Sequence, residues 1–251
     1  MIDGWLGPMP HPQKWVFIVG CYNSGTTLLH DMLAIHPQIG SMDREGQYYT
    51  DQLPMPRRHG FPRLWALQPD MFYLKEGDGR HINVARLKRQ WGAHFDDCTR
   101  RVLLEKSPTN AARTRWLQEH FEDAHFIGII RNGYAVAEGI HRKEGHPLDV
   151  TAVQWALSNE IMLRDFEVLR EKQLIRYETL TGFFEEVLRE ILEFVGLKPI
   201  GSNVADRTWR IHEQVSPIRN MNQRSLEALG DKERKVIDAA AGHMLEYLGY
   251  M

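Results

Sequence analysis

Short apolar runs alternate with longer amphipathic stretches along most of the chain. The runs at 15–20, 102–106 and 124–130 have the length of buried strands, and a shorter one follows at 174–177. Segments with helical periodicity separate them, and another closes the chain at 231–248. Strands that alternate with helices pair in parallel through right-handed crossovers. The pattern therefore predicts an α/β fold with a central parallel sheet and helices on both faces.

The boundaries of the helices follow from the same periodicity and from capping residues. Thr109 or Asn110 is expected to cap the third helix, and Asp231 the last, because their side-chain oxygens can accept from free N–H groups. The segment 40–61 is rich in proline, glycine and tyrosine, and we expect an irregular loop there. Helices are expected at 25–35, 82–95, 111–120, 132–143, 151–170, 179–195 and 231–248.

Neither an internal repeat nor a low-complexity linker divides the sequence. We therefore predict a single domain over residues 1–251. Prolines at three positions make 1–14 an extended lead-in, and 40–97 is expected to hold the loops and helices of an acceptor pocket. The segment 198–222 has little periodicity and is expected to close over a bound donor.

Composition excludes several classes of partner. A formal net charge of -2 over 251 residues gives no reason to expect nucleic acid. Two cysteines, Cys21 and Cys98, make no disulfide framework. No apolar run reaches the roughly 18 residues of a membrane span, and the N-terminus lacks the features of a signal peptide. We expect a cytoplasmic protein with no membrane partner; the oligomeric state is not readable.

The loop after the first predicted strand is the most informative segment. It runs from Gly20 to Gly25, where a helix is expected to begin, and Thr26 and Thr27 follow. Backbone N–H groups at a helix start, together with hydroxyls, form a cradle for an anion. An ordinary glycine turn is the alternative interpretation. Thr26 stands where a nucleotide triphosphatase carries lysine, so the loop predicts a phosphate-like ligand without ATP hydrolysis.

Basic residues follow the next two predicted strands. Lys106 ends one of them and Arg131 follows the other, so both should reach the edge where parallel sheets bind ligands. A lysine there can stabilise charge on a transferring group, and an arginine at a helix start can hold a phosphate with two hydrogen bonds. The alternatives are a solvated lysine paired with Glu105 and an arginine that caps a neighbouring helix. Arg142 and Lys143 could extend the basic patch.

Taken together, these segments resemble the sulfotransferase family. NSGTTLL at 23–29, EKSP at 105–108, FIGIIRNG at 126–133 and RYETL at 176–180 occur in the family's order, and the likeness spans about 16–197. The resemblance implies a three-layer sandwich of the P-loop nucleotide-binding type. It also implies an enzyme that moves a sulfuryl group from 3′-phosphoadenosine 5′-phosphosulfate (PAPS) to an acceptor hydroxyl, without a metal. The product nucleotide is adenosine 3′,5′-bisphosphate (PAP).

The same resemblance implies roles for individual residues. Loop residues 24–27 would hold the 5′-phosphosulfate, and Lys106 would stabilise the bridging oxygen or the sulfuryl group. Arg131 would take the 3′-phosphate, Tyr177 would border the adenine, and Arg219 would close over the 3′-phosphate. The residues expected to bind the donor are Asn23, Ser24, Gly25, Thr26, Thr27, Leu28, Arg131, Gly139, Tyr177 and Arg219.

Two of these positions depart from the family's pattern. Many members carry arginine or lysine where this chain has Asn23, and serine where it has Gly139. Loss of one hydroxyl contact costs about 0.5–1.5 kcal/mol. We therefore expect donor binding to be weakened but not abolished.

The catalytic base is expected in the loop after the His36–Pro37 pair. Asp43 and Glu45 lie in that window, and we prefer Glu45 as the base, with Lys106 as the second catalytic residue. A base at this point would take the proton of the acceptor hydroxyl. A solvated loop carboxylate is the alternative interpretation of Glu45.

Histidines and aromatic residues add candidates that the pattern does not resolve. His120, His125, His141 and His146 lack partner cysteines in zinc-like spacing, so surface or capping roles are expected and no metal is predicted. Four aromatic residues within 40–97 could line the acceptor pocket or pack in the core. They are Tyr48, Tyr49, Trp65 and Trp91.

The expected acceptor is the hydroxyl of a small molecule, whose identity the sequence does not encode. A nucleotide or small-molecule kinase is the main alternative; Thr26 in the lysine position and the lack of an evident magnesium-binding aspartate at a second strand end argue against it. A catalytically idle nucleotide sensor is a third possibility. Asn23 and Gly139 favour it and Lys106 argues against it.

Overall fold

A central sheet of five parallel strands organises the molecule. The computed structural model describes residues 5–79, 81–199, 209–211, 214–216 and 218–251. The strands follow the order β2-β3-β1-β4-β5, and every neighbouring pair is parallel. The prediction of a central parallel sheet is therefore confirmed. The strands are β1 (Lys14–Gly20), β2 (Ile39–Ser41), β3 (Val102–Lys106), β4 (Ala124–Ile130) and β5 (Glu171–Arg176).

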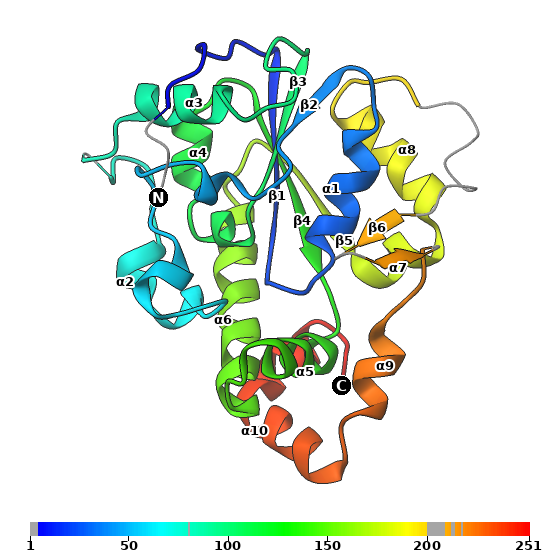
Figure 1. Cartoon of the computed structure of the whole chain (residues 1–251). Helices are drawn as coiled ribbons and strands as arrows, with labels where there is room; N and C mark the ends of the chain where they lie inside the picture. The colour runs from blue at the N-terminus through cyan, green and yellow to red at the C-terminus, as the bar shows by residue number, and fades with distance from the viewer. Residues whose placement is uncertain (1–4, 80, 200–208, 212–213, 217) are drawn as a thin grey trace.

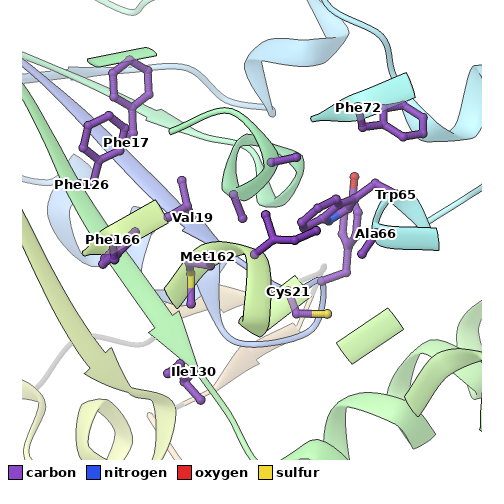
Figure 2. Close-up of a cluster of buried hydrophobic side chains, with 14 of the residues drawn as sticks. Phe17, Val19, Cys21, Trp65, Ala66, Phe72, Phe126, Ile130, Met162 and Phe166 are labelled. Carbon is purple, nitrogen blue, oxygen red and sulfur yellow. The ribbon is translucent and has the colours of Figure 1, made fainter. Parts of the chain in front are cut away.

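Side chains of successive strand residues point to opposite faces of the sheet, and each face has its own core. On β1, Trp15 and Phe17 pack into one core while Val16 and Ile18 pack into the other. Figure 1 shows α1 and α8 on one side of the sheet and α3, α4 and α6 on the other. Figure 2 shows part of the larger core, where Phe17 lies among side chains of the sheet and of α6. The three layers expected from the sequence are present.

Every connection between the strands of the central sheet contains at least one helix. The α-helices are α1 (Thr26–Ala34), α2 (Pro69–Phe72), α3 (Val84–Gly92), α4 (Thr114–His120), α5 (Gly133–Glu144), α6 (Leu148–Phe166), α7 (Tyr177–Gly182), α8 (Phe184–Phe194), α9 (Asn222–Glu227) and α10 (Asp231–Tyr247). Short 3₁₀ turns are η1 (Gly46–Tyr48), η2 (Pro56–His59), η3 (Trp65–Leu67) and η4 (Pro108–Ala112). No helix among the described residues combines the length and the hydropathy needed to cross a lipid bilayer.

The predicted caps were wrong, and for Thr109 and Asn110 the reason is that tertiary contacts claim the capping side chains. The third expected helix starts at Thr114, after η4. Asn110 Nδ2 donates to Glu105 Oε2 at 2.5 Å, and Thr109 Oγ1 lies 3.1 Å from the hydroxyl of Tyr22. Asp231 is the first residue of α10 and not its cap.

The edges of the sheet are the part that the apolar pattern described least well. β5 begins at Glu171, three residues before the expected run, and β2 lies at the start of the segment expected to be irregular. Most β5 residues are exposed, and β5 is the edge strand of the sheet in the part of the chain that the structure describes. The helix expected at 179–195 is divided at Phe183 into α7 and α8.

The expected closing segment 198–222 is only partly described. Its described parts include β6 (Trp209–Ile211) paired antiparallel with β7 (Gln214–Ser216). Residues 200–208, 212–213 and 217 lie outside the described residues, as do residues 1–4 of the expected lead-in.

Candidate active site

The loop between β1 and α1 forms one wall of a cavity at the carboxyl edge of the sheet. Gly25 precedes the first turn of α1 with φ 100°, a left-handed conformation. A Cβ atom at Gly25 would lie 2.5 Å from Cδ2 of Tyr177, so only glycine lets the loop and the tyrosine ring approach this closely. The first N–H groups of α1 lack intrahelical partners and carry the positive end of the helix dipole.

The cavity has a volume of about 420 Å³ and gathers almost all the residues expected to bind the donor. Nine of those ten residues line it, and Glu45 lines it as well. The exception is Ser24, whose side chain is fully buried and is not part of the lining. Segments far apart in the sequence therefore meet as expected from the topology.

Positive charge dominates the cavity wall. Among the described lining residues, Glu45 carries the sole carboxylate. This local excess of positive charge contrasts with the formal net charge of -2 for the chain. It suits a ligand with several negative charges. The basic residues of the lining are Arg63, Arg131, Arg142, Lys143, Arg219 and Arg224.

Arg131 lies between the loop and the α9 side of the cavity. Its Nη1 donates to the backbone oxygen of Asn23 at 2.7 Å, and its Nε donates to Oδ1 of Asn222 at 2.8 Å. Its guanidinium lies 4.1 Å from the centre of the Tyr177 ring. Burial lowers the pKa of Arg131, although the nearby tyrosine and Glu178 favour the charged form. Because none of these contacts is to a helix C-terminus, the capping alternative is wrong.

Tyr177 connects the loop to the segment before α9. Its hydroxyl donates to the carbonyl of Arg219 at 3.3 Å and accepts from the backbone N–H of Met221 at 3.1 Å. Arg219 and Met221 both line the cavity. The tyrosine therefore positions the late basic segment over the loop.

Lys106 and Glu45 form the other end of the site. Lys106 Nζ lies 3.3 Å from Oγ1 of Thr27 and 3.6 Å from Oε1 of Glu45. Only 9% of the lysine side chain is exposed, so the solvated alternative is wrong, and its partner is Glu45 and not Glu105. Gln47 Nε2 donates to the other Glu45 oxygen at 2.5 Å and also to the hydroxyl of Tyr22 at 3.0 Å. The Glu45 carboxylate is thus held from both sides.

Beneath this pair, Glu105 fixes the backbone of the loop that carries Glu45. Its Oε1 accepts from the N–H of Gly46 at 2.9 Å and from the Ser107 hydroxyl, and its Oε2 accepts from Asn110 Nδ2. Burial raises the pKa of Glu105 to about 7. The guanidinium of Arg113 is also fully buried and lies near enough to feel the charge of Glu105.

Replacing Glu105 with leucine is expected to lower the free energy of unfolding by about 3 kcal/mol or more. The change leaves the Gly46 N–H without its hydrogen-bond acceptor and the buried Arg113 without a counter-charge. Urea unfolding measures the loss. Glu167→Leu is the control, because Glu167 is exposed and should change stability by no more than about 0.5 kcal/mol. Equal stabilities of the two variants would contradict a supporting role for Glu105.

The remaining candidates lie away from the cavity. Asp43 is exposed and accepts a hydrogen bond from the hydroxyl of Tyr49. Trp65 and Trp91 are fully buried in the larger core, so the packing alternative is confirmed for both. Tyr49 stacks on His94 at a ring-centre distance of 3.9 Å.

Several cavity residues were not expected from the sequence. Arg63 sits in the irregular stretch before η3, and Arg224 and Ser225 belong to α9. Tyr22 precedes Asn23 in the loop and could have been inferred from that position. The others carry no motif, because only the folding of distant segments brings them to the cavity. In the described part of the chain, no three His, Cys, Asp or Glu side chains lie together as metal ligands would.

Comparisons with known proteins agree on one family. A family model described as the sulfotransferase family matches residues 16–200. Protein-tyrosine sulfotransferase A of Caenorhabditis elegans is 27% identical over 210 residues, which are 78% of this chain and 52% of the relative. The chain therefore spans about half the length of that curated relative.

Solved structures share the fold. The sulfotransferase domain from the Synechococcus PCC 7002 olefin synthase aligns with a TM-score of 0.59 at 21% identity, covering 94% of this chain and 97% of that one. Mouse sulfotransferase SULT7A1 complexed with PAP aligns with a TM-score of 0.52 at 12% identity, covering 95% of this chain and 86% of that one. At these identities the likeness shows a common fold.

Proposed function

Because this chain belongs to the sulfotransferase family, we propose that it transfers a sulfuryl group from PAPS to an acceptor hydroxyl. One observation carries the proposal, namely the charge of the cavity wall. Six basic side chains and the start of α1 line the cavity, and among the described lining residues Glu45 alone carries a carboxylate. The phosphates and sulfate of PAPS match the basic part, and an acceptor hydroxyl matches the carboxylate. The mouse relative, which was solved with PAP, supports the choice of nucleotide.

The donor is proposed to lie across the cavity from the loop to α9. The N–H groups at residues 25–28 and the hydroxyls of Thr26 and Thr27 would bind the 5′-phosphosulfate. Arg131 and Arg219 would bind the 3′-phosphate, and Tyr177 would border the adenine. All of these groups line the one cavity, which fits a ligand with anionic groups at two ends.

Glu45 and Lys106 are the proposed catalytic residues. PAPS supplies an activated sulfuryl group on a phosphate oxygen. Glu45 takes the proton of the acceptor hydroxyl as the acceptor oxygen bonds to sulfur. Lys106 stabilises the negative charge that grows on the bridging oxygen as the bond from that oxygen to sulfur breaks. Sulfuryl transfer of this kind depends mainly on positioning and electrostatics, as phosphoryl transfer does.

The proposed acceptor is a hydroxyl on a small molecule. The name of the nematode relative refers to protein tyrosine, so a tyrosine-containing peptide is the natural comparison. A panel of small alcohols, phenols and such a peptide, assayed with sulfur-labelled PAPS, identifies the acceptor class. Transfer to the peptide but to no small molecule would overturn this part of the proposal.

PAP at 100 times its Kd is expected to raise Tm by about 5–10 °C. Binding at that excess adds about 2.7 kcal/mol to the free energy of unfolding, and 1 kcal/mol shifts Tm by about 2–4 °C in a chain of this size. ATP with Mg²⁺ is expected to give a smaller shift, because Thr26 stands in the position of the lysine that contacts the outer phosphates. Differential scanning fluorimetry compares the two ligands.

The same measurements separate the other two interpretations. A larger shift with ATP and Mg²⁺ than with PAP would favour a kinase. A PAP-induced shift without sulfuryl transfer to any member of the acceptor panel would favour a nucleotide sensor.

A further inference from the structure

The uncharged side chain of Asn23 accepts hydrogen bonds from two cationic side chains. Its Oδ1 accepts from Nη1 of Arg63 at 3.0 Å and from Nζ of Lys143 at 3.0 Å. Its backbone oxygen accepts from Arg131, as described above. Three basic side chains from three separate segments therefore converge on one residue of the loop.

The orientation of the Asn23 amide is fixed by these contacts. Because Oδ1 must accept from both cations, Nδ2 points the other way, towards Gly139 on α5. A Cβ atom at Gly139 would lie 3.1 Å from that nitrogen, which is tighter than ordinary packing. The amide thus fills the room that a side chain at 139 would need. The two departures from the family's pattern are consequently one structural feature.

Arg63 is held in place although it lies in an irregular segment. Its backbone has φ 65°, and its Nε donates to Oε1 of Glu144 at 2.8 Å. Its guanidinium lies 5.4 Å from the centre of the Tyr22 ring. Arg57 also bonds to Glu144, at 2.6 Å, but it is more than half exposed and does not line the cavity. Glu144 can offset only part of this positive charge.

We propose that Arg63 and Lys143, held by the side chain of Asn23, bind the 3′-phosphate of the donor and supply the positive charge that position 23 lacks. The inference rests on the proposed function. The 3′ end is chosen because Asn23 contacts Arg131 and lies against Gly139, whereas Lys106 contacts Thr27 and pairs with Glu45. Asn23 is a positioning residue in this arrangement, and the two cations are binding residues.

Arg63→Met and Lys143→Met are each expected to weaken PAP binding by about 10-fold or more, because each removes a charge-assisted hydrogen bond. Binding of adenosine 5′-monophosphate, which lacks the 3′-phosphate, should change by less than about 2-fold. Isothermal titration calorimetry with both nucleotides gives the comparison. Arg57→Met is the matched control: it removes the other arginine on Glu144 and should leave both affinities unchanged.

Asn23→Asp tests the positioning role with almost no change in shape. The new carboxylate would neutralise Arg63 and Lys143 and repel the phosphate, so PAP affinity should fall by about 10-fold while the monophosphate is little affected. Gly139→Ala should weaken PAP binding by about 3-fold in the native background but have no further effect in Asn23→Gly, where the amide is gone. Equal effects of Gly139→Ala in the two backgrounds would refute the coupling.

The pH dependence of PAP binding gives a readout that a purely structural role would not move. Lys143 is exposed as a whole residue, but its ammonium is partly desolvated. This desolvation and the nearby positive charges of Arg63, Arg142 and Arg131 lower the pKa of Lys143 to about 8. The negative charge of Glu144 offsets only part of this decrease. Since the phosphate binds the protonated form, PAP affinity should fall by about 10-fold between pH 7 and pH 9. Lys143→Met should lose this dependence, and its persistence would contradict the assignment.

Two results overturn the inference. One is PAP binding by the Arg63 and Lys143 variants as tight as that of the native chain. The other is an equal loss of affinity for PAP and for adenosine 5′-monophosphate, which would indicate that Arg63 and Lys143 contact the 5′-phosphate instead. If the native chain does not bind PAP at all, the proposed function itself fails, and the two failures are thereby distinguishable.

Discussion

Glu45→Gln is expected to lower kcat by about 10²–10⁴-fold while Kd for PAP changes little. A positioned general base contributes this much to a proton transfer, and glutamine keeps the shape and the contact with Gln47 but cannot accept the proton. The carboxylate lies 3.6 Å from Lys106 and lines the donor cavity, so it can face a bound acceptor. Initial rates with saturating PAPS and the best acceptor of the panel measure the effect.

Asp43→Asn is the matched control for this experiment. Asp43 lies two residues away in the same loop but is exposed and bonded to Tyr49. Its substitution should leave kcat within about 2-fold of the native value. Near-normal kcat of Glu45→Gln together with a large loss of kcat in Asp43→Asn would indicate that Asp43, and not Glu45, is the catalytic base.

Lys106→Met is expected to lower kcat by about 10²–10³-fold. Removal of one group that stabilises developing negative charge typically has this cost, and methionine fills nearly the same space. Because the ammonium lies 3.3 Å from Thr27 and is largely buried, water is poorly placed to replace it. Single-turnover rates with labelled PAPS separate this loss from any change in donor binding.

A second buried lysine provides the control. Lys88 is similarly buried at 11% side-chain exposure, but it pairs with Glu122, and its ammonium lies 4.9 Å from the centre of the Phe121 ring. Lys88→Met should leave the single-turnover rate unchanged. A loss in Lys106→Met no larger than in this control would exclude Lys106 from the chemistry.

The sequence predicted the central strands closely because buried parallel strands read as continuous apolar runs. The runs at 102–106 and 124–130 coincide with β3 and β4. The edge strand β5 was predicted only in part, because residues at an open edge face solvent and need not be apolar. Capping residues were misassigned where a buried partner, such as Glu105 for Asn110, competes for the same side chain.

Some residues of the candidate site were likewise predictable from the sequence, and others were not. Lys106 ends β3, Arg131 follows β4, and the loop at 23–28 comes after β1. They could be found because the carboxyl ends of parallel strands meet at one edge of the sheet. Arg63 could not be found, because it reaches the cavity from an irregular segment through contacts with Asn23 and Glu144.

The amino-acid sequence by itself determined the α/β architecture and the strand-end residues, since both follow from local hydrophobic pattern and chain order. Only the tertiary structure decided what surrounds Asn23. Side-chain contacts between distant segments bring two cations to a neutral residue and place its amide against Gly139, and no local pattern records such contacts.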